Sequence, residues 1–184
     1  MLSKVGIMSC AHAAWIESSY TMGKALACAV GNGANSRVHT PVDFSGFSAC
    51  LREAEYLIIH THGSAEGLYD FRADGKGGTL ATLSQLAALP KIPTLRLVII
   101  TACEAAGGDI QHNVASVLSS RIADEGLVIA NRHVVWGADY DFGEKNGLCG
   151  WVAYRDGRLL LDENAFPPKI TMADAYRCFC DQSH

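Results

Sequence analysis

The sequence predicts an α/β protein with a mostly parallel central sheet of about six strands and helices on both faces. Residues 56–59 and 97–100 are each four consecutive apolar positions, which is typical of strands buried on both faces of a sheet. Helix-like segments lie between the successive strand-like runs, as parallel strands require. A chain of 184 residues with 49% hydrophobic content can bury a core, and no linker or internal repeat divides it. We therefore expect a single domain over residues 1–184.

The first half of the chain alternates between strand and helix patterns. The expected elements are a strand at 4–9, a helix at 15–30, a strand at 36–40, a helix at 44–53 and a strand from Tyr56. Gly31 is placed to end the first helix, and Asp43 is placed to cap the second. Gly31 and Gly33 form a Gly-x-Gly pattern, but it follows a helix, which argues against a phosphate-binding loop.

The second half contains the clearest helix pattern and a hairpin. The expected elements are a strand-to-helix segment at 79–88, a strand at 95–101, a helix at 109–124, a strand at 127–130, a hairpin of 151–154 with 158–161, and a helix at 173–180. Asp109 is the expected cap of the long helix, and Gly126 lies just past its end. The Asp-Gly pair at 156–157 favours a tight two-residue turn in the hairpin.

Two polar, glycine-bearing segments, 63–78 and 137–147, are too irregular for a regular element and are expected to be loops. The first directly follows His62, so we expect it to face a substrate. Between the fifth strand and the second loop, residues 134–136 either extend that strand or form a short strand of their own.

Composition excludes several partner classes. The net charge is -4 and no basic patch is visible, so we expect no nucleic-acid partner. No apolar run approaches the roughly 18 residues that span a bilayer, so we expect no membrane association. The first residues are interpreted as a strand and not as a signal peptide, and the seven cysteines lack the spacing of a disulfide framework. Both features favour a cytoplasmic location.

The chemistry-bearing residues follow two of the buried strands. The run from Tyr56 ends in His62-Gly63, and the run from Leu97 stops at Cys103. If the two strands are parallel neighbours, their carboxyl ends meet at one sheet edge, where ligands bind. A thiol needs help to attack a carbonyl carbon because the thiolate is the reactive form, and a nearby histidine can supply that help.

Backbone donors complete this hypothesis. Gly63 has no side chain, so its N–H can approach a substrate oxygen closely, and together with the Cys103 N–H it could form an oxyanion hole. The positive end of the helix expected from Asp109 could also stabilise a thiolate, if it points that way.

Other interpretations of the same residues stay open. Cys103 could be a buried cysteine at a strand end, and His62 could cap its strand through a backbone hydrogen bond. His60, two residues earlier on the same side of a regular strand, could be the working base. Glu104 is interpreted as a surface residue. The ligand-type residues Cys178, Cys180 and His184 lack the paired spacing of structural zinc sites, so we expect no metal and a terminal helix there.

The two motifs, 56–63 and 97–108, resemble those of the caspase-like cysteine peptidases. That group includes caspases, metacaspases, legumain, gingipains, clostripain, separase and the bacterial CHAT-domain proteases, and the small residues after Cys103 look most like the CHAT branch. The strand and hairpin patterns between 127 and 161 also fit this group. The resemblance implies a three-layer caspase-like sandwich that hydrolyses peptide bonds without a cofactor. It implies that Cys103 is the nucleophile, His62 the general acid/base, and Gly63 and Cys103 the oxyanion donors.

The resemblance also implies a pocket for the side chain that precedes the scissile bond. Members that cut after basic residues often carry Asp two positions before the cysteine, where this chain has Thr101, so a basic preference is not implied. Negative charge could come instead from acidic residues of the two loops, namely Asp139, Asp141, Glu144, Asp70 and Asp74. His12, in the segment after the first strand, is expected to border the pocket. Trp136 is either a packing residue or part of the pocket wall.

The expected ligand is a protein or peptide substrate. Because no recognition module is visible, a regulatory protein partner could present substrates or control activity. Two rival functions remain: a catalytically silent caspase-like binding module, and a different thiol enzyme such as an amidase or acyltransferase. An open groove along the sheet edge would favour peptides, whereas a narrow, closed pocket would favour the second rival.

Overall fold

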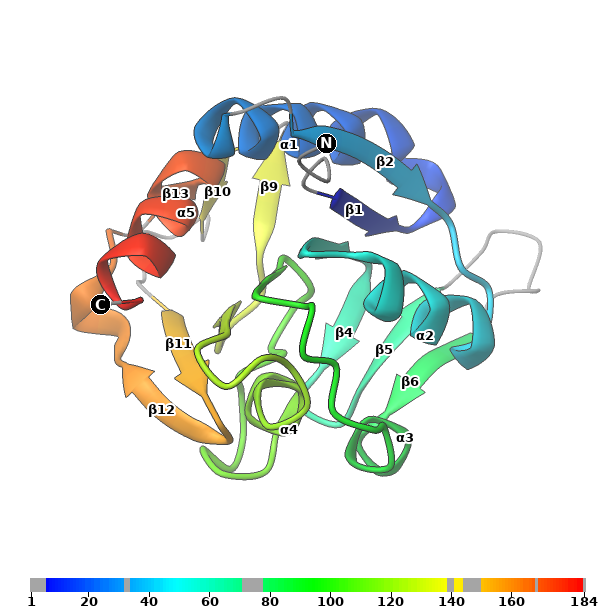
Figure 1. Ribbon diagram of the computed structural model, residues 1–184. Helices are drawn as coiled ribbons and strands as arrows, with labels where there is room; N and C mark the ends of the chain where they lie inside the picture. Colours follow the sequence, from blue (N-terminus) through cyan, green and yellow to red (C-terminus); the bar gives the residue numbers. More distant parts are fainter. Residues whose placement is uncertain are drawn as a thin grey trace.

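A seven-stranded sheet, in the order β12-β11-β8-β7-β3-β1-β2, forms the centre of the molecule (Figure 1). The computed structural model describes residues 6–31, 34–70, 78–138, 141–143, 150–167 and 169–183. The strands of the central sheet are β1 (Gly6–Ala11), β2 (Asn35–His39), β3 (Tyr56–His60), β7 (Leu97–Ile100), β8 (Leu127–Asn131), β11 (Trp151–Arg155) and β12 (Arg158–Leu161). The first five are parallel, and β11 is antiparallel to both of its neighbours. The predicted α/β class with a mostly parallel sheet is confirmed, with one strand more than expected.

Helices cover both faces of this sheet, as predicted. They are α1 (Ile16–Val30), α2 (Phe44–Glu53), α3 (Leu83–Ala87), α4 (Val114–Ser119) and α5 (Met172–Asp181), with short 3₁₀ turns η1 (Ala13–Trp15) and η2 (Glu163–Ala165). Side chains of α1 and α5 pack with Ile58 and Ile99 on one face, while those of α2, α3 and α4 pack with Leu57 and Val98 on the other. Both faces of β3 and β7 are therefore buried, which explains why their apolar residues are consecutive.

Two small three-stranded sheets flank the central one. One contains β4 (His62–Ser64), β5 (Gly67–Asp70) and β6 (Gly78–Thr82), and the other contains β9 (Trp136–Ala138), β10 (Asp141–Gly143) and β13 (Lys169–Thr171). The prediction that residues 63–78 form a loop is therefore wrong for β4 and β5, and the predicted loop at 137–147 is wrong for β9 and β10. These strands of three or four residues are too short and too glycine-rich to show an apolar alternation.

Several local predictions are confirmed by backbone geometry. Gly31 ends α1 with a φ of 69°, and the Asp43 side chain accepts a hydrogen bond of 2.8 Å from the Gly46 N–H at the start of α2. Asp156 and Gly157, with φ values of 47° and 75°, form the turn between β11 and β12. Positive φ at both positions is what a primed two-residue turn requires.

The predicted helix at 109–124 is wrong in extent, because α4 contains only Val114–Ser119. Asp109 is not its cap: the Asp109 carboxylate accepts from the Gln111 N–H in a turn before the helix. The cap is the buried Asn113, whose Oδ1 accepts from the Ser116 N–H at 2.9 Å. The two hydrogens of the Asn113 amide are shared among three acceptors within hydrogen-bond distance, namely the carbonyls of Ala106 and Asp109 and the hydroxyl of Tyr154.

Replacing Asn113 by alanine is expected to lower the free energy of unfolding by about 3 kcal/mol, because it removes the helix cap and the hydrogen bond between the Asn113 amide and the buried Tyr154 hydroxyl. The matched variant Asp109→Ala loses one exposed hydrogen bond and is expected to cost under about 1 kcal/mol. Urea denaturation at pH 7 measures both values. Equal losses in the two variants would contradict the assignment of Asn113 as the anchor of this segment.

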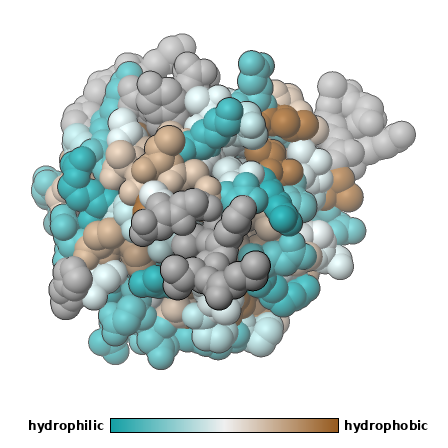
Figure 2. All heavy atoms as spheres, turned by 45° about the horizontal axis from the view of Figure 1, so that its top comes forward, coloured by the Kyte–Doolittle hydropathy of each residue, from teal (hydrophilic) through white to brown (hydrophobic). Residues whose placement is uncertain are grey.

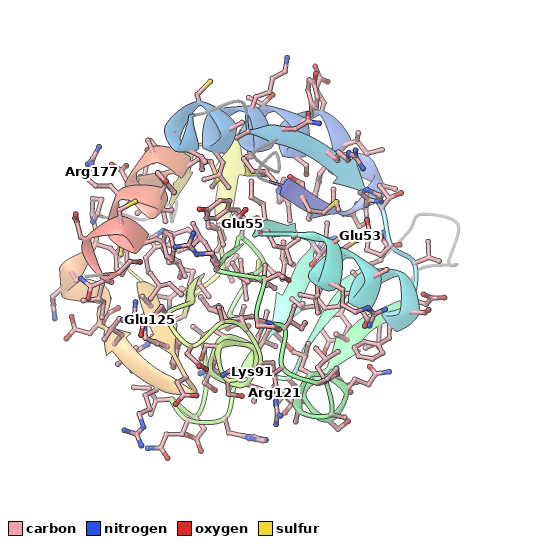
Figure 3. All side chains as sticks on the ribbon, in the orientation of Figure 1. Glu53, Glu55, Lys91, Arg121, Glu125 and Arg177 are labelled. Carbon is pink, nitrogen blue, oxygen red and sulfur yellow. The ribbon has the colours of Figure 1, made fainter. Side chains whose placement is uncertain are left out.

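The segments that lead into β7 and β8 are joined before the strands begin. Figure 3 shows Lys91, which follows α3, beside Arg121, which follows α4. The Ile92 N–H donates to the Arg121 carbonyl at 2.7 Å, and Ile92 pairs with Ile122 in an isolated parallel bridge. Lys91 also forms an ion pair of 2.9 Å with the exposed Asp124, a contact that adds little stability. This junction aligns the two strands, so that their carboxyl ends reach the same edge.

The surface is mixed in character. On the face shown in Figure 2, hydrophobic side chains form separate small groups among hydrophilic ones. Among the described residues, the large hydrophobic side chains that are exposed are spread along the chain: two lie in α1, one lies in β12 and three lie in connecting segments, namely Ile16, Tyr20, Leu160, Val42, Ile110 and Val134. Within the described ranges, no helix has the length and apolar content needed to cross a bilayer.

Candidate active site

The candidate site lies at the carboxyl ends of β3 and β7. These strands are parallel neighbours, with Ile59 opposite Ile100, as the sequence predicts. The predicted continuous strand 56–63 is wrong, however, because β3 ends at His60 and a separate strand, β4, begins at His62. His60 and His62 consequently lie in different strands and do not share one side of a regular strand.

Thr101 joins the two strands and is not an open pocket residue. Its N–H and its hydroxyl both donate to the Ile59 carbonyl, at 2.9 and 3.2 Å, and the residue is only 6% exposed. The position that carries Asp in basic-cleaving relatives of the resembled family is thus occupied by a buried, internally bonded threonine.

Gly63 brings the histidine segment against the cysteine segment. A Cβ atom built on Gly63 would lie 2.7 Å from the Ala102 Cβ and 3.1 Å from the Cys103 carbonyl oxygen. Real Cβ atoms essentially never show the first of these distances. Only glycine lets β4 approach the turn after β7 this closely, so the backbone of His62-Gly63 and that of Cys103 are immediate neighbours.

Two backbone N–H groups at this contact have no acceptor among the described residues. Ser64 and Gly67 flank a two-residue turn, which makes them a hydrogen-bonded pair of the β4–β5 ladder. The next pair, Gly63 with Leu68, is therefore non-hydrogen-bonded, and the Gly63 N–H points away from β5. The Cys103 N–H donates to no acceptor within the described part of the chain. The N–H groups of Gly63 and Cys103 are the two donors that the sequence predicts for an oxyanion hole.

The cysteine sits on a tightly bonded turn. Cys103 is half-buried, and its Sγ lies 4.0 Å from the Val135 carbonyl oxygen. Glu104 has a φ of 51°, which is unfavourable for a non-glycine residue, and its N–H donates to the His133 carbonyl at 2.9 Å. Ala106 adds a second bond, to the Asn131 carbonyl. Strain next to a partly exposed thiol, maintained by hydrogen bonds, is typical of functional turns.

Aromatic rings surround His62. Its ring centroid lies 5.1 Å from that of His12 in an edge-on arrangement and 4.7 Å from that of Trp15. Trp15 also stacks on His60, with the centroids 4.9 Å apart and the planes at 25°. The backbone fixes the same cluster, because the His12 N–H donates to the His60 carbonyl at 2.8 Å. The segment that follows β1 therefore packs against both histidines, with His12 and Trp15 next to His62 and Trp15 next to His60.

Burial lowers the pKa of His62, the positive charge of His12 lowers it further, and the negative charge of Asp70 raises it. His62 is therefore neutral at neutral pH and able to accept a proton. The residue is half-buried.

His60 has the features of a structural histidine. Its Nδ1 lies 2.8 Å from the Ser19 hydroxyl of α1, and Trp15 stacks on its ring. Burial, followed by the charges of His12 and His62, lowers the pKa of His60 to about 4. Because its pKa lies far below neutral pH, His60 is less suited to general acid/base catalysis than His62.

The low pKa of His60 predicts an acid-sensitive fold. Because the unfolded chain binds a proton below about pH 6.5 while folded His60 resists it until about pH 4, stability is full above pH 6.5 and is lost as the pH falls. We expect His60→Asn, which retains a partner for Ser19, to weaken the loss of stability between pH 7 and pH 4 by about 2 kcal/mol. Urea titrations of both proteins measure this, and identical pH dependence would contradict the assignment.

The remaining predicted pocket residues are only partly described. Asp139 lies outside the described residues, as do Asp74, Glu144 and His184. Trp136 begins β9, which is a separate strand and no extension of β8, and Asp141 begins β10, but their side chains are not described. In the described part of the chain, no group of three metal-ligating side chains could hold an ion.

Sequence reasoning missed Trp15, Ser19 and the anchoring role of Asn113. Trp15 and Ser19 are four residues apart at the start of α1, a spacing that places two side chains on one helix side. That spacing, directly after a strand that ends near His12, is a usable signal. Nothing local indicated that Asn113 would contact Tyr154, which lies 41 positions later.

A comparison with known proteins finds no match: no family model fits the chain, and no curated protein is significantly similar to it.

Proposed function

We propose that this chain is a single-domain, caspase-like cysteine peptidase in which Cys103 and His62 form the catalytic dyad. The observation that carries the proposal is the contact of Gly63 with the Cys103 turn, which brings together a partly exposed thiol, a neutral imidazole and two N–H donors that have no acceptor in the described part of the chain. The resemblance of both motifs to caspase-like peptidases supports the same assignment.

The reaction follows from these groups. His62 takes the proton of the Cys103 thiol, and the sulfur attacks the carbonyl carbon of a peptide bond. The N–H groups of Gly63 and Cys103 stabilise the negative oxygen of the tetrahedral intermediate. His62 then gives its proton to the departing amine, which leaves a thioester on Cys103. A water molecule that loses a proton to His62 hydrolyses the thioester and restores the thiol.

The proposed substrate is a protein or peptide, cut in the cytoplasm without a cofactor, with a regulatory protein partner controlling access. The buried Thr101 supports the view that the pocket is not the basic type of the resembled family.

A peptide-library screen tests the proposal. Cleavage products are read by mass spectrometry for the wild type, Cys103→Ala and His62→Ala, together with labelling by a thiol-reactive peptide probe. We expect products and label with the wild type only. Equal turnover by all three proteins would overturn the peptidase assignment. Probe labelling without cleavage of any peptide would favour another thiol enzyme, and neither label nor products would favour a silent binding module.

A further inference from the structure

Asp70 and His12 form a connected pair behind His62. Asp70, the last residue of β5, is 1% exposed, and a carboxylate so deeply buried needs polar or charged neighbours. Its Oδ1 lies 3.7 Å from the Nε2 of His12, which is itself only 7% exposed. The buried carboxylate thus faces a buried imidazole at the rim of the central sheet.

The backbone fixes which nitrogen of His12 carries a proton. Its Nδ1 accepts a hydrogen bond of 3.1 Å from the Ala14 N–H and caps η1, so this nitrogen cannot hold a hydrogen of its own. In its neutral form the ring consequently carries its hydrogen on Nε2, which faces Asp70. The ring also contacts Trp15 at 4.8 Å and, edge-on, His62 at 5.1 Å.

We propose that Asp70 and His12 are positioning residues for His62: Asp70 holds the His12 imidazole, and His12 sets the orientation of the His62 imidazole. The inference rests on the proposed function in so far as it concerns catalysis. The alternative is that the pair merely stabilises the fold where β1, β4 and β5 meet.

The effects of Asp70 and His12 on His62 can be measured separately, through the pKa of His62. The titratable groups near His62 come from four places: His12 after β1, His60 at the end of β3, Tyr69 and Asp70 in β5, and Cys103 in the turn that Gly63 contacts. Among these, Asp70 raises the pKa of His62, whereas His12 and burial lower it. Removing Asp70 and removing His12 should therefore move the titration of His62 in opposite directions.

The test uses Asp70→Asn and His12→Asn in the full chain. The first substitution keeps the shape of the side chain, and the second keeps an acceptor for the Ala14 N–H because asparagine is a good cap. Asp181→Asn and His39→Asn, at exposed positions, are the matched controls. The readouts are the ring NMR titration of His62, which needs no substrate, and the kcat and KM for any peptide that the wild type cleaves.

We expect the pKa of His62 to fall by at least about half a unit in Asp70→Asn and to rise by a similar amount in His12→Asn. We expect kcat to fall roughly 10- to 100-fold in both, with KM little changed, because the reacting groups are misplaced while binding is retained. Unchanged His62 titration in both variants, or shifts no larger than those of the controls, would overturn the proposal. If the titration shifts but the wild type cleaves no peptide, the coupling stands and the peptidase assignment is what fails.

Discussion

Replacing Cys103 by alanine is expected to lower kcat for peptide hydrolysis at least about ten-thousand-fold, because no other group can form the thioester. The loss should leave the fold intact. Cys103 is only half-buried, and its hydrogen bond to Val135 is at the distance limit for sulfur, so the free energy of unfolding should change by less than about 1 kcal/mol. Steady-state kinetics and urea denaturation of the same preparations measure both quantities.

A double substitution sharpens this prediction. If Cys103 and His62 act as one unit, the variant that lacks both should be no slower than either single variant, because the residual rate comes from binding and the backbone donors alone. Cys28→Ala, which removes an exposed thiol from α1, is the matched control and should keep full activity. Multiplied losses in the double variant would show that the two residues act independently and would contradict the dyad.

The variant Gly63→Ala is expected to have the second largest effect, a loss of about 100- to 1000-fold in kcat. The added methyl group would lie 2.7 Å from the Ala102 Cβ, so β4 must move away from the turn after β7. That movement withdraws the Gly63 N–H from the substrate oxygen, and it also displaces the neighbouring His62. Because the donor matters most in the transition state, kcat should fall more than KM rises.

The matched control is Gly78→Ala, at the first residue of β6. Among the described residues, a Cβ there meets nothing within 4 Å, so the substitution should change neither kcat nor the free energy of unfolding by a measurable amount. Both glycines lie in the same small sheet, and only Gly63 touches the cysteine turn. A Gly63→Ala protein with wild-type kcat would exclude the Gly63 N–H from the reaction.

Much of the fold could be predicted because its signals are local. Runs of apolar residues predict the buried strands β3, β7 and β8. Gly31, Asp43 and the Asp-Gly turn at 156–157 end or cap their elements through contacts within a few residues. The prediction failed where a distant contact decides the local structure. The helix expected at 109–124 is shortened around Asn113, whose amide bonds to Tyr154 of β11.

The candidate site shows the same division. The positions of His62 and Cys103 just after neighbouring strands follow from the apolar runs, because parallel strands bring their carboxyl ends together. The different surroundings of His60 and His62 did not follow, because both histidines are half-buried and only their contacts distinguish them. The break between β3 and β4 and the bond from Ser19 separate the roles of His60 and His62, and a run of residues that reads as one continuous strand cannot reveal either feature.

The sequence by itself determined the chain order of the central strands and the sheet edge at which His62 and Cys103 lie. Tertiary structure alone decided that Gly63 touches the Cys103 turn, that His12 and Trp15 lie against His62, and that Asp70 faces His12. The physical reason is the separation in sequence over which each interaction acts. Apolar periodicity and caps act between residues a few positions apart, whereas the approach of β4 to the cysteine turn depends on how separate elements pack.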